Sequence, residues 1–156
     1  MKKAAVVTRA ATPLGSALEF LQHLWRVNHA LERLSSRMER HLGITAQQRL
    51  VIRCIGKHPG MTAGQLARLL HLDPGTISAA LRRLERRDLV VRCRAPLDKR
   101  RVALSLTATG RALTRPAAGT VEHAVERLLA SARDADIDTT TALLGRLITF
   151  LTAEAA

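Results

Sequence analysis

Residues 73–101 read DPGTISAALRRLERRDLVVRCRAPLDKRR and combine a helical pattern, a strand pattern and a concentration of positive charge. Between Arg82 and Arg101, nine basic residues stand against three acidic ones, which leaves a net charge of +6. These twenty residues hold half of the formal charge of +12 of the 156-residue chain. Positive charge of this density within a structured segment indicates a surface that meets a polyanion.

The beginning of this stretch predicts a helix, and its end predicts a hairpin. Asp73 and Pro74 are typical of a helix start, because aspartate caps the first free amides and proline fits the first turn. After Leu89 the apolar residues alternate on both sides of residues 96–100, as they do in paired strands. The helix would pack through the apolar stripe of Ile77, Ala80, Leu81 and Leu84.

Two further helices are predicted just before this stretch. Thr45 and Thr62 each stand where threonine caps a helix, and residues 58–60 separate the two helices. Only the short link 71–72 joins the second of them to the helix that begins after Asp73. Helices joined so tightly must cross at an angle, which is the outline of a helix-turn-helix.

Long helices are predicted at both ends of the chain. The first would cover residues 12–42. A second would run through residues 108–129 with a kink at Pro116, and Asp136 or Asp138 would begin the last one. The first and last of these helices carry apolar stripes that the central unit does not cover.

We therefore expect a fold that is mainly α with a small β-hairpin wing. A winged helix-turn-helix lobe would occupy residues 43–107, and helical dimerisation segments would occupy residues 12–42 and 108–156 of the same continuous fold. A second copy of the chain would cover the apolar stripes of the end helices most simply, so we expect a two-fold homodimer.

Composition narrows the classes of function. With 47% apolar and 24% charged residues the chain should fold, and a pI near 11.5 favours nucleic acid as its partner. Aromatic residues make up only 2%, which argues against recognition of single strands by stacked bases and leaves the duplex backbone or an anionic membrane as a partner for the charge. No apolar segment approaches the length of a membrane span, so we expect a cytoplasmic protein with no membrane partner.

The sequence offers nothing that would carry a reaction. It contains no glycine-rich phosphate loop, no GxSxG, no HExxH and no paired metal-ligand spacing, so we expect no enzyme, no metal and no cofactor. Cys54 and Cys93 allow two interpretations. Both could be small buried apolar residues in a reducing compartment, or one could be a thiol sensor. Cys93 is the better sensor candidate, since Arg92 and Arg94 flank it and cations lower the pKa of a thiol.

The helix-turn-helix outline predicts which residues contact DNA. The N-terminal part of its second helix enters the major groove, where an arginine on guanine contributes about 1–3 kcal/mol of discrimination. Arg86 and Arg87 lie further along, where a solvated helix face is an equally good interpretation. The charged hairpin tip would reach the minor groove. The predicted DNA contacts are Gly75, Thr76, Ser78, Ala79, Arg82, Arg83, Asp98, Lys99, Arg100 and Arg101.

Residues 43–113 resemble the multiple antibiotic resistance regulator (MarR) family of winged helix-turn-helix transcription factors. The resemblance implies a homodimer on a pseudo-palindromic operator, acting as a repressor. It also implies release by a phenolic or other aromatic ligand, by an acyl thioester or by cysteine oxidation. Four pieces carry it: TAGQLA at 62–67, DPGTIS at 73–78, LRRLERR at 81–87, and DKR at 98–100 followed by LTATG at 106–110.

The resemblance also implies roles for individual residues. Asp98 and Arg100 would be the aspartate and arginine of the wing motif. The effector cleft of the family lies between the dimerisation helices and the DNA-binding lobe, so a small effector would meet the first helix. The residues predicted to bind it are Trp25, Arg26, Asn28 and His29. Thr76, Ser78, Arg82 and Arg83 would be the major-groove or phosphate contacts.

Three residues depart from the family pattern. Ala79 stands where many relatives carry arginine or another polar residue, and Gly75 stands where serine is usual. Asp88 replaces the glycine that commonly ends the recognition helix, and it must then adopt the geometry of a helix C-terminus. Two alternatives to the ligand-released repressor stay open: an architectural DNA-binding protein without a ligand switch, and a cysteine-based redox-sensing repressor.

Overall fold

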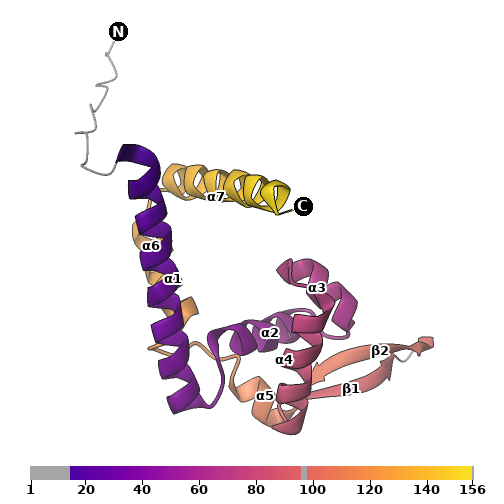
Figure 1. Ribbon diagram of the computed structural model, residues 1–156. Helices are drawn as coiled ribbons and strands as arrows, with labels where there is room; N and C mark the ends of the chain where they lie inside the picture. Colours follow the sequence, from indigo (N-terminus) through magenta and orange to yellow (C-terminus); the bar gives the residue numbers. More distant parts are fainter. Residues whose placement is uncertain (1–14, 96–97, 156) are drawn as a thin grey trace.

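The computed structural model describes residues 15–95 and 98–155, with the side chains of residues 95 and 98–101 outside that description. The described part of the chain is mainly helical with one antiparallel hairpin, as predicted (Figure 1). In chain order the elements are α1 (Gly15–Leu42), α2 (Ala46–Lys57), α3 (Ala63–Leu70), α4 (Pro74–Arg86), β1 (Val90–Ala95), β2 (Asp98–Leu106), α5 (Ala108–Ala112), α6 (Val121–Ser131) and α7 (Asp134–Glu154).

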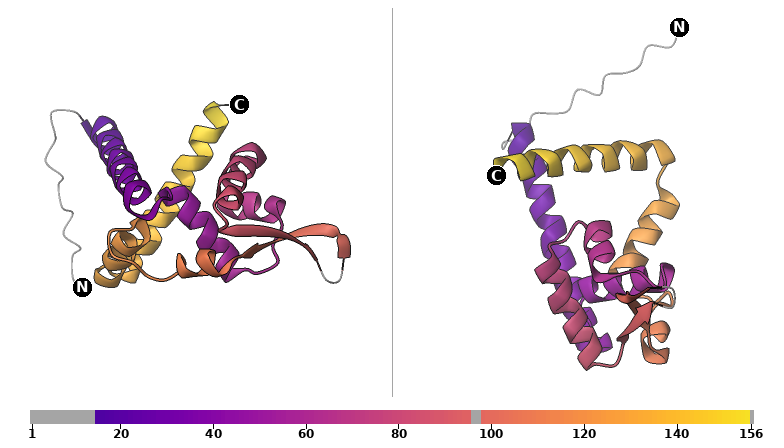
Figure 2. Two further views of the ribbon diagram at one scale, coloured as in Figure 1. Left: turned by 90° about the horizontal axis from the view of Figure 1, so that it is seen from below. Right: turned by 90° about the vertical axis from the view of Figure 1, so that its right-hand side faces the viewer.

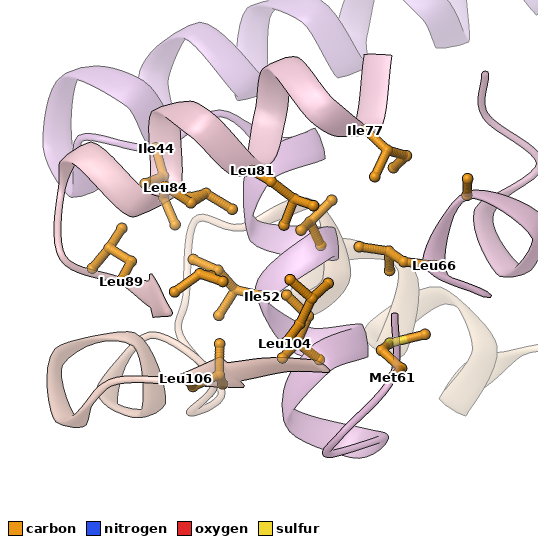
Figure 3. Packing of buried hydrophobic residues seen from close by; sticks show 14 residues of the cluster. Ile44, Ile52, Met61, Leu66, Ile77, Leu81, Leu84, Leu89, Leu104 and Leu106 are labelled. Carbon is orange, nitrogen blue, oxygen red and sulfur yellow. The ribbon is translucent and has the colours of Figure 1, made fainter. Parts of the chain in front are cut away.

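The central lobe is built around one apolar cluster (Figure 3). Ile52 of α2 and Leu81 of α4 are fully buried in it, and Leu104 brings β2 into the same cluster. The backbone of Leu104 also exchanges hydrogen bonds with the segment before α3, donating to Met61 O at 2.8 Å and accepting from Gly60 N at 3.3 Å. The hairpin is therefore fastened to the helices by both packing and backbone bonds.

Side-chain caps begin the lobe helices where the sequence places them. Thr45 and Thr62 each form a capping box, in which the threonine accepts from the backbone of the glutamine three residues on and that glutamine accepts in return. Thr107 caps α5 by accepting from Gly110 N at 3.0 Å. Asp88 adopts a left-handed conformation with a φ of 52° after α4, as the missing glycine requires.

The predicted single helix over residues 108–129 is wrong, because the chain forms two helices there. α5 ends at Ala112, and α6 begins at Val121 with Thr120 as its cap. Between them lie Pro116, which cannot continue a helix, and Gly119 in a left-handed conformation. The predicted start of the last helix is also wrong, since α7 begins at Asp134.

A buried arginine joins the lobe to α6. Arg49 of α2 is 1% exposed, and its guanidinium donates to Leu113 O at 2.6 Å and to Arg115 O at 2.7 Å. Its Nε lies 3.2 Å from Glu122 Oε1, a charge contact that lacks the alignment of a hydrogen bond. One turn further along both helices, Arg53 pairs with Glu126 at 3.3 Å on the surface. We call the Arg49–Glu122 contact the inner rung and the Arg53–Glu126 pair the outer rung.

The helices α1, α6 and α7 leave much apolar surface uncovered. α6 contacts α1, and α7 then runs at a steep angle to α6 (Figure 2). Neither α6 nor α7 has a buried residue among those described. The large apolar side chains exposed on these helices include Leu18, Trp25, Leu128, Leu144, Ile148, Phe150 and Leu151.

Removing the buried guanidinium should destabilise the protein strongly. Arg49→Met leaves Glu122 buried without its counter-charge, so we expect a loss of about 3–5 kcal/mol in the free energy of unfolding. Adding Glu122→Leu should recover part of that loss, because no unpaired carboxylate then stays buried. Chemical denaturation measures both values. An Arg49→Met variant as stable as the parent would contradict this account of the inner rung.

Gly110 is required where α5 meets the hairpin. A Cβ at this position would come within 2.0 Å of Leu89 O, so Gly110→Ala must push α5 away from the lobe. We expect a loss of about 1–3 kcal/mol on thermal unfolding. Gly64→Ala is the matched control, because a Cβ there would meet only the end of Arg68 at 3.9 Å. It should leave stability equal or slightly higher.

Candidate nucleic-acid interface

The start of α4 is held by Asp73. Its carboxylate accepts from Thr76 N at 2.8 Å and from the Thr76 hydroxyl. The hydroxyl bond, followed by the backbone bonds, lowers the pKa of Asp73, because these donors favour the charged form. The Thr76 hydroxyl proton is therefore already donated to the Asp73 carboxylate. To donate to a phosphate oxygen, Thr76 would have to break this hydrogen bond of the cap. Thr76 is better placed to fix the helix start than to donate to DNA.

Four residues of α4 follow one another on its exposed face. Gly75, Ala79, Arg82 and Arg86 are spaced by three or four residues, which places them in one row along the helix. Gly75, Arg82 and Arg86 are exposed, and Ala79 is half-buried. The opposite face is the buried apolar stripe, so the core fixes which side α4 turns outward. The row carries two guanidinium groups and, at its N-terminal end, almost no side chain.

Arg83 and Arg87 flank this row on the side of α1 and α2. The guanidinium of Arg87 lies over the α1–α2 turn, so close that a Cβ on Gly43 would come within 2.2 Å of its Nη2. Arg87 therefore covers the turn, while Arg86 shares the outward row. Ser78, on the other flank, is half-buried.

A cleft beside α4 adds residues that the sequence did not single out. It has a volume of about 380 Å³ and brings the exposed Gln47 of α2 next to Arg83. No sequence signal near Gln47 could have predicted that it lies beside α4, because the α4 residues that line the cleft with it lie about thirty residues away in the chain. The cleft is lined by Ser35, Thr45, Gln47, Gln48, Thr76, Ala79, Ala80 and Arg83.

The wing is oriented by an ion pair with α4. Arg92 Nε of β1 contacts Glu85 Oε1, so the charge of Arg92 is engaged within the protein. In the hairpin Arg92 lies opposite Leu104, and the register becomes irregular between Arg94 and Ala95. The predicted contacts of the tip belong to the N-terminal part of β2, and their side chains lie outside the described structure: Asp98, Lys99, Arg100 and Arg101.

Three of the four predicted effector residues share a hollow on α1. Trp25, Arg26 and His29 line a space of about 760 Å³ along this helix. Asn28 does not line it, because its amide turns aside and donates to Glu32 Oε1 at 3.0 Å. The hollow is strongly basic, since Arg33, Arg37 and Arg40 also line it.

The two cysteines differ in their surroundings and form no disulfide. Cys93 is exposed, so the interpretation of both cysteines as buried residues is wrong. Cys54 is half-buried, and burial raises the pKa of its thiol, although Lys57 and Arg53 act in the opposite direction. Across the described residues, no group of three or more His, Cys, Asp or Glu side chains could hold a metal ion. No helix in the same ranges is long and apolar enough to cross a membrane.

Known proteins share both the sequence and the architecture. A family model described as MarR family matches residues 42–101. An HTH-type transcriptional repressor of Mycobacterium tuberculosis is 33% identical over 107 residues, which cover 69% of this chain and 77% of that one.

Solved structures agree with the sequence matches. The Streptococcus pneumoniae FabT structure, in complex with DNA, has a TM-score of 0.66 at 26% identity and covers 88% of this chain and 99% of that one. The PcaV transcriptional regulator of Streptomyces coelicolor, in complex with its natural ligand, has a TM-score of 0.67 at 26% identity. It covers 90% of this chain and 98% of the other. With a helix-turn-helix, a hairpin wing and a relative that matches more than two thirds of its length, the chain belongs to the MarR family.

Proposed function

We propose that the protein is a homodimeric transcriptional regulator that binds a specific DNA operator as a repressor and leaves it when a small ligand binds. The observation that carries this proposal is the outward row of α4, in which Arg82 and Arg86 follow two residues with little or no side chain. The apolar core fixes which side of α4 faces outward. A helix of this kind fits the major groove. The FabT complex with DNA supports the same use of the fold.

Arginine supplies most of the DNA contacts in this proposal. Arg82 contacts base edges or phosphates from the centre of the row, and Arg83 does so from its flank. Because Gly75 and Ala79 have little or no side chain, the backbone of α4 comes close to the floor of the groove. Ser78 adds a hydroxyl to a phosphate, and Thr76 acts through the cap. In the wing, Lys99, Arg100 and Arg101 meet the flanking minor groove. Asp98 instead fixes the turn by pairing with Arg100 or Arg101 or with a backbone amide, which aims the neighbouring guanidinium before DNA arrives.

A second copy of the chain completes the molecule. The apolar side chains on α1, α6 and α7 are too numerous for a helix that stays in water, and an isologous pair would cover them in both copies at once. Such a pair presents two α4 helices to successive major grooves of a pseudo-palindrome.

The ligand of this regulator is an aromatic compound or an acyl thioester that binds beside the dimerisation helices. The hollow on α1 supports this, since Trp25 offers an aromatic surface and Arg26 and His29 offer polar contacts. In this proposal Asn28 does not contact the ligand directly and acts through its hydrogen bond to Glu32. The PcaV structure, which is in complex with its natural ligand, supports a ligand-binding role for this fold.

DNA binding should be specific and sensitive to salt. In an electrophoretic shift assay with the promoter nearest its own gene, the protein should retain a sequence preference at physiological salt. If six to ten phosphates are contacted, affinity should fall by roughly 10³–10⁵ between about 50 and 200 mM salt. Equal affinity for unrelated duplexes at physiological salt would contradict the proposal and favour an architectural DNA-binding protein.

Arg82→Gln tests the role of the α4 row. We expect operator affinity to fall by about 1–3 kcal/mol and the preference at one base pair to weaken, because a bidentate contact with guanine is lost. Arg127→Gln on α6 removes the same charge from an exposed position outside the row, so it should change affinity little. Fluorescence anisotropy with the operator and single-base variants measures both. Equal losses in the two variants would show that charge alone matters.

A further inference from the structure

Apolar packing stops short of α6 at its junction with the lobe. All buried residues of the core cluster lie between Ile44 and Leu106, within the lobe. None of the described residues of α6 is buried, and Leu113, which precedes it, is only partly buried against the cluster. Hydrophobic contact is non-directional, and little of it is present at this junction. The angle between the lobe and α6 therefore depends on polar contacts, which are directional.

Helices α1, α2 and α6 contact one another in pairs and close a triangle. At the corner between α1 and α2, Gly43 is left-handed with a φ of 70°, and Ser35 Oγ accepts from Ala46 N at 3.0 Å. α1 and α6 face each other across an apolar groove of about 250 Å³. The third contact, between α2 and α6, consists of the inner and the outer rung. Two helices joined at one corner can hinge there, and the third contact removes that freedom.

The inner rung is the stronger part of this third contact. The Arg49 guanidinium donates to Leu113 O and Arg115 O in the segment before α6, and its Nε faces Glu122 on α6 itself. Because Arg49 is 1% exposed, breaking these contacts would leave a buried charge without partners. The side chains of the outer rung are 31% and 51% exposed, so that pair is weak. Arg49 therefore supplies most of the constraint on the angle.

We propose that Arg49 is a positioning residue that selects the spacing between the two half-sites of the operator. In a dimer joined through α1, α6 and α7, the angle at the inner rung fixes the separation and the relative rotation of the two α4 helices. One added base pair moves a half-site by about 3.4 Å and rotates it by about 35°. A rigid dimer therefore fits one spacing and rejects its neighbours. This inference rests on the proposed function, to which it adds a determinant of operator choice.

Operators that differ only in spacing test the proposal. The half-sites of the promoter nearest its own gene are kept, and the spacer between them is shortened or lengthened by one or two base pairs. The full-length parent should prefer its best spacing by about tenfold or more over spacings one base pair away. In the double variant Arg49→Met/Glu122→Leu, which leaves no unpaired buried charge, this ratio should fall below about threefold. Fluorescence anisotropy measures the affinity for each operator.

Two controls separate the angle from charge and from stability. Arg127→Gln removes a positive charge from an exposed position on α6 outside the rungs. Ile52→Val weakens the lobe core and leaves both rungs in place. Both variants should keep the spacing ratio of the parent. A reduced ratio in either control would overturn the proposal, as would an unchanged ratio in the double variant.

Arg49→Lys is a second variant that keeps the buried charge, and it decides the question if the double variant does not fold. Lysine is a point charge without the planar fork of arginine, so it cannot hold both carbonyl groups in the same geometry. We expect a spacing ratio between those of the parent and the double variant. A ratio equal to that of the parent would overturn the assignment of the constraint to the guanidinium.

A distance measurement follows the angle in the absence of DNA. Spin labels on the exposed Cys93 of the lobe and on Arg127→Cys of α6, in a Cys54→Ser background, report the separation within one chain. Excess unlabelled protein ensures that each dimer carries only one labelled chain. The parent should give a narrow distribution of distances by pulsed electron paramagnetic resonance, and Arg49→Lys a broader one. Equal widths would overturn the proposal.

Failure of the proposed function has a different signature. A parent that binds all spacings equally, or that occupies a single half-site, would contradict a dimer on a pseudo-palindromic operator. The distance distributions within one chain would still decide whether Arg49 fixes the angle of the lobe.

Discussion

The contact between Arg49 and the segment after α5 is the constraint on which the arrangement of the molecule depends. A guanidinium that is 1% exposed must satisfy its donors inside the protein, and Arg49 does so with two carbonyl groups and one carboxylate. These partners lie on α6 or in the segment between α5 and α6, whereas Arg49 belongs to α2 of the lobe. The direction in which the lobe faces relative to α6 is therefore held by one buried side chain, with the outer rung of Arg53 and Glu126 as a weaker second support.

The local structure of the lobe could be predicted from the sequence because its signals are local. A capping residue, the amide it accepts from and the apolar stripe that follows lie within a few residues of one another, as at Thr45, Thr62 and Asp73. The left-handed conformation of Asp88 could also be predicted, since the turn between α4 and β1 requires it whichever residue stands there. These same local signals identified the row of α4 as a candidate DNA contact.

The features that were missed depend on residues that are distant in the sequence. Arg49 looks like any other charge on a helix until Leu113, Arg115 and Glu122 are placed around it. The break between α5 and α6 is an exception, because its signals are local. Pro116 alone permits a kink, and the combination with Gly119 and the Thr120 cap forces two helices. The place of Gln47 in the cleft beside α4 likewise depends on packing between elements. The sequence pattern therefore predicts which face of each helix is buried better than it predicts the clefts that remain between two packed helices.

The exposed apolar face of α7 affects how the stability of the protein must be measured. A helix of 21 residues with no buried side chain in its own chain gains little from that chain, and a helix in water is marginal by itself. If another copy covers this face, the ordering of α7 and the association of two chains become one equilibrium. The melting temperature then rises with protein concentration, and a stability quoted without that concentration describes only one point on a curve.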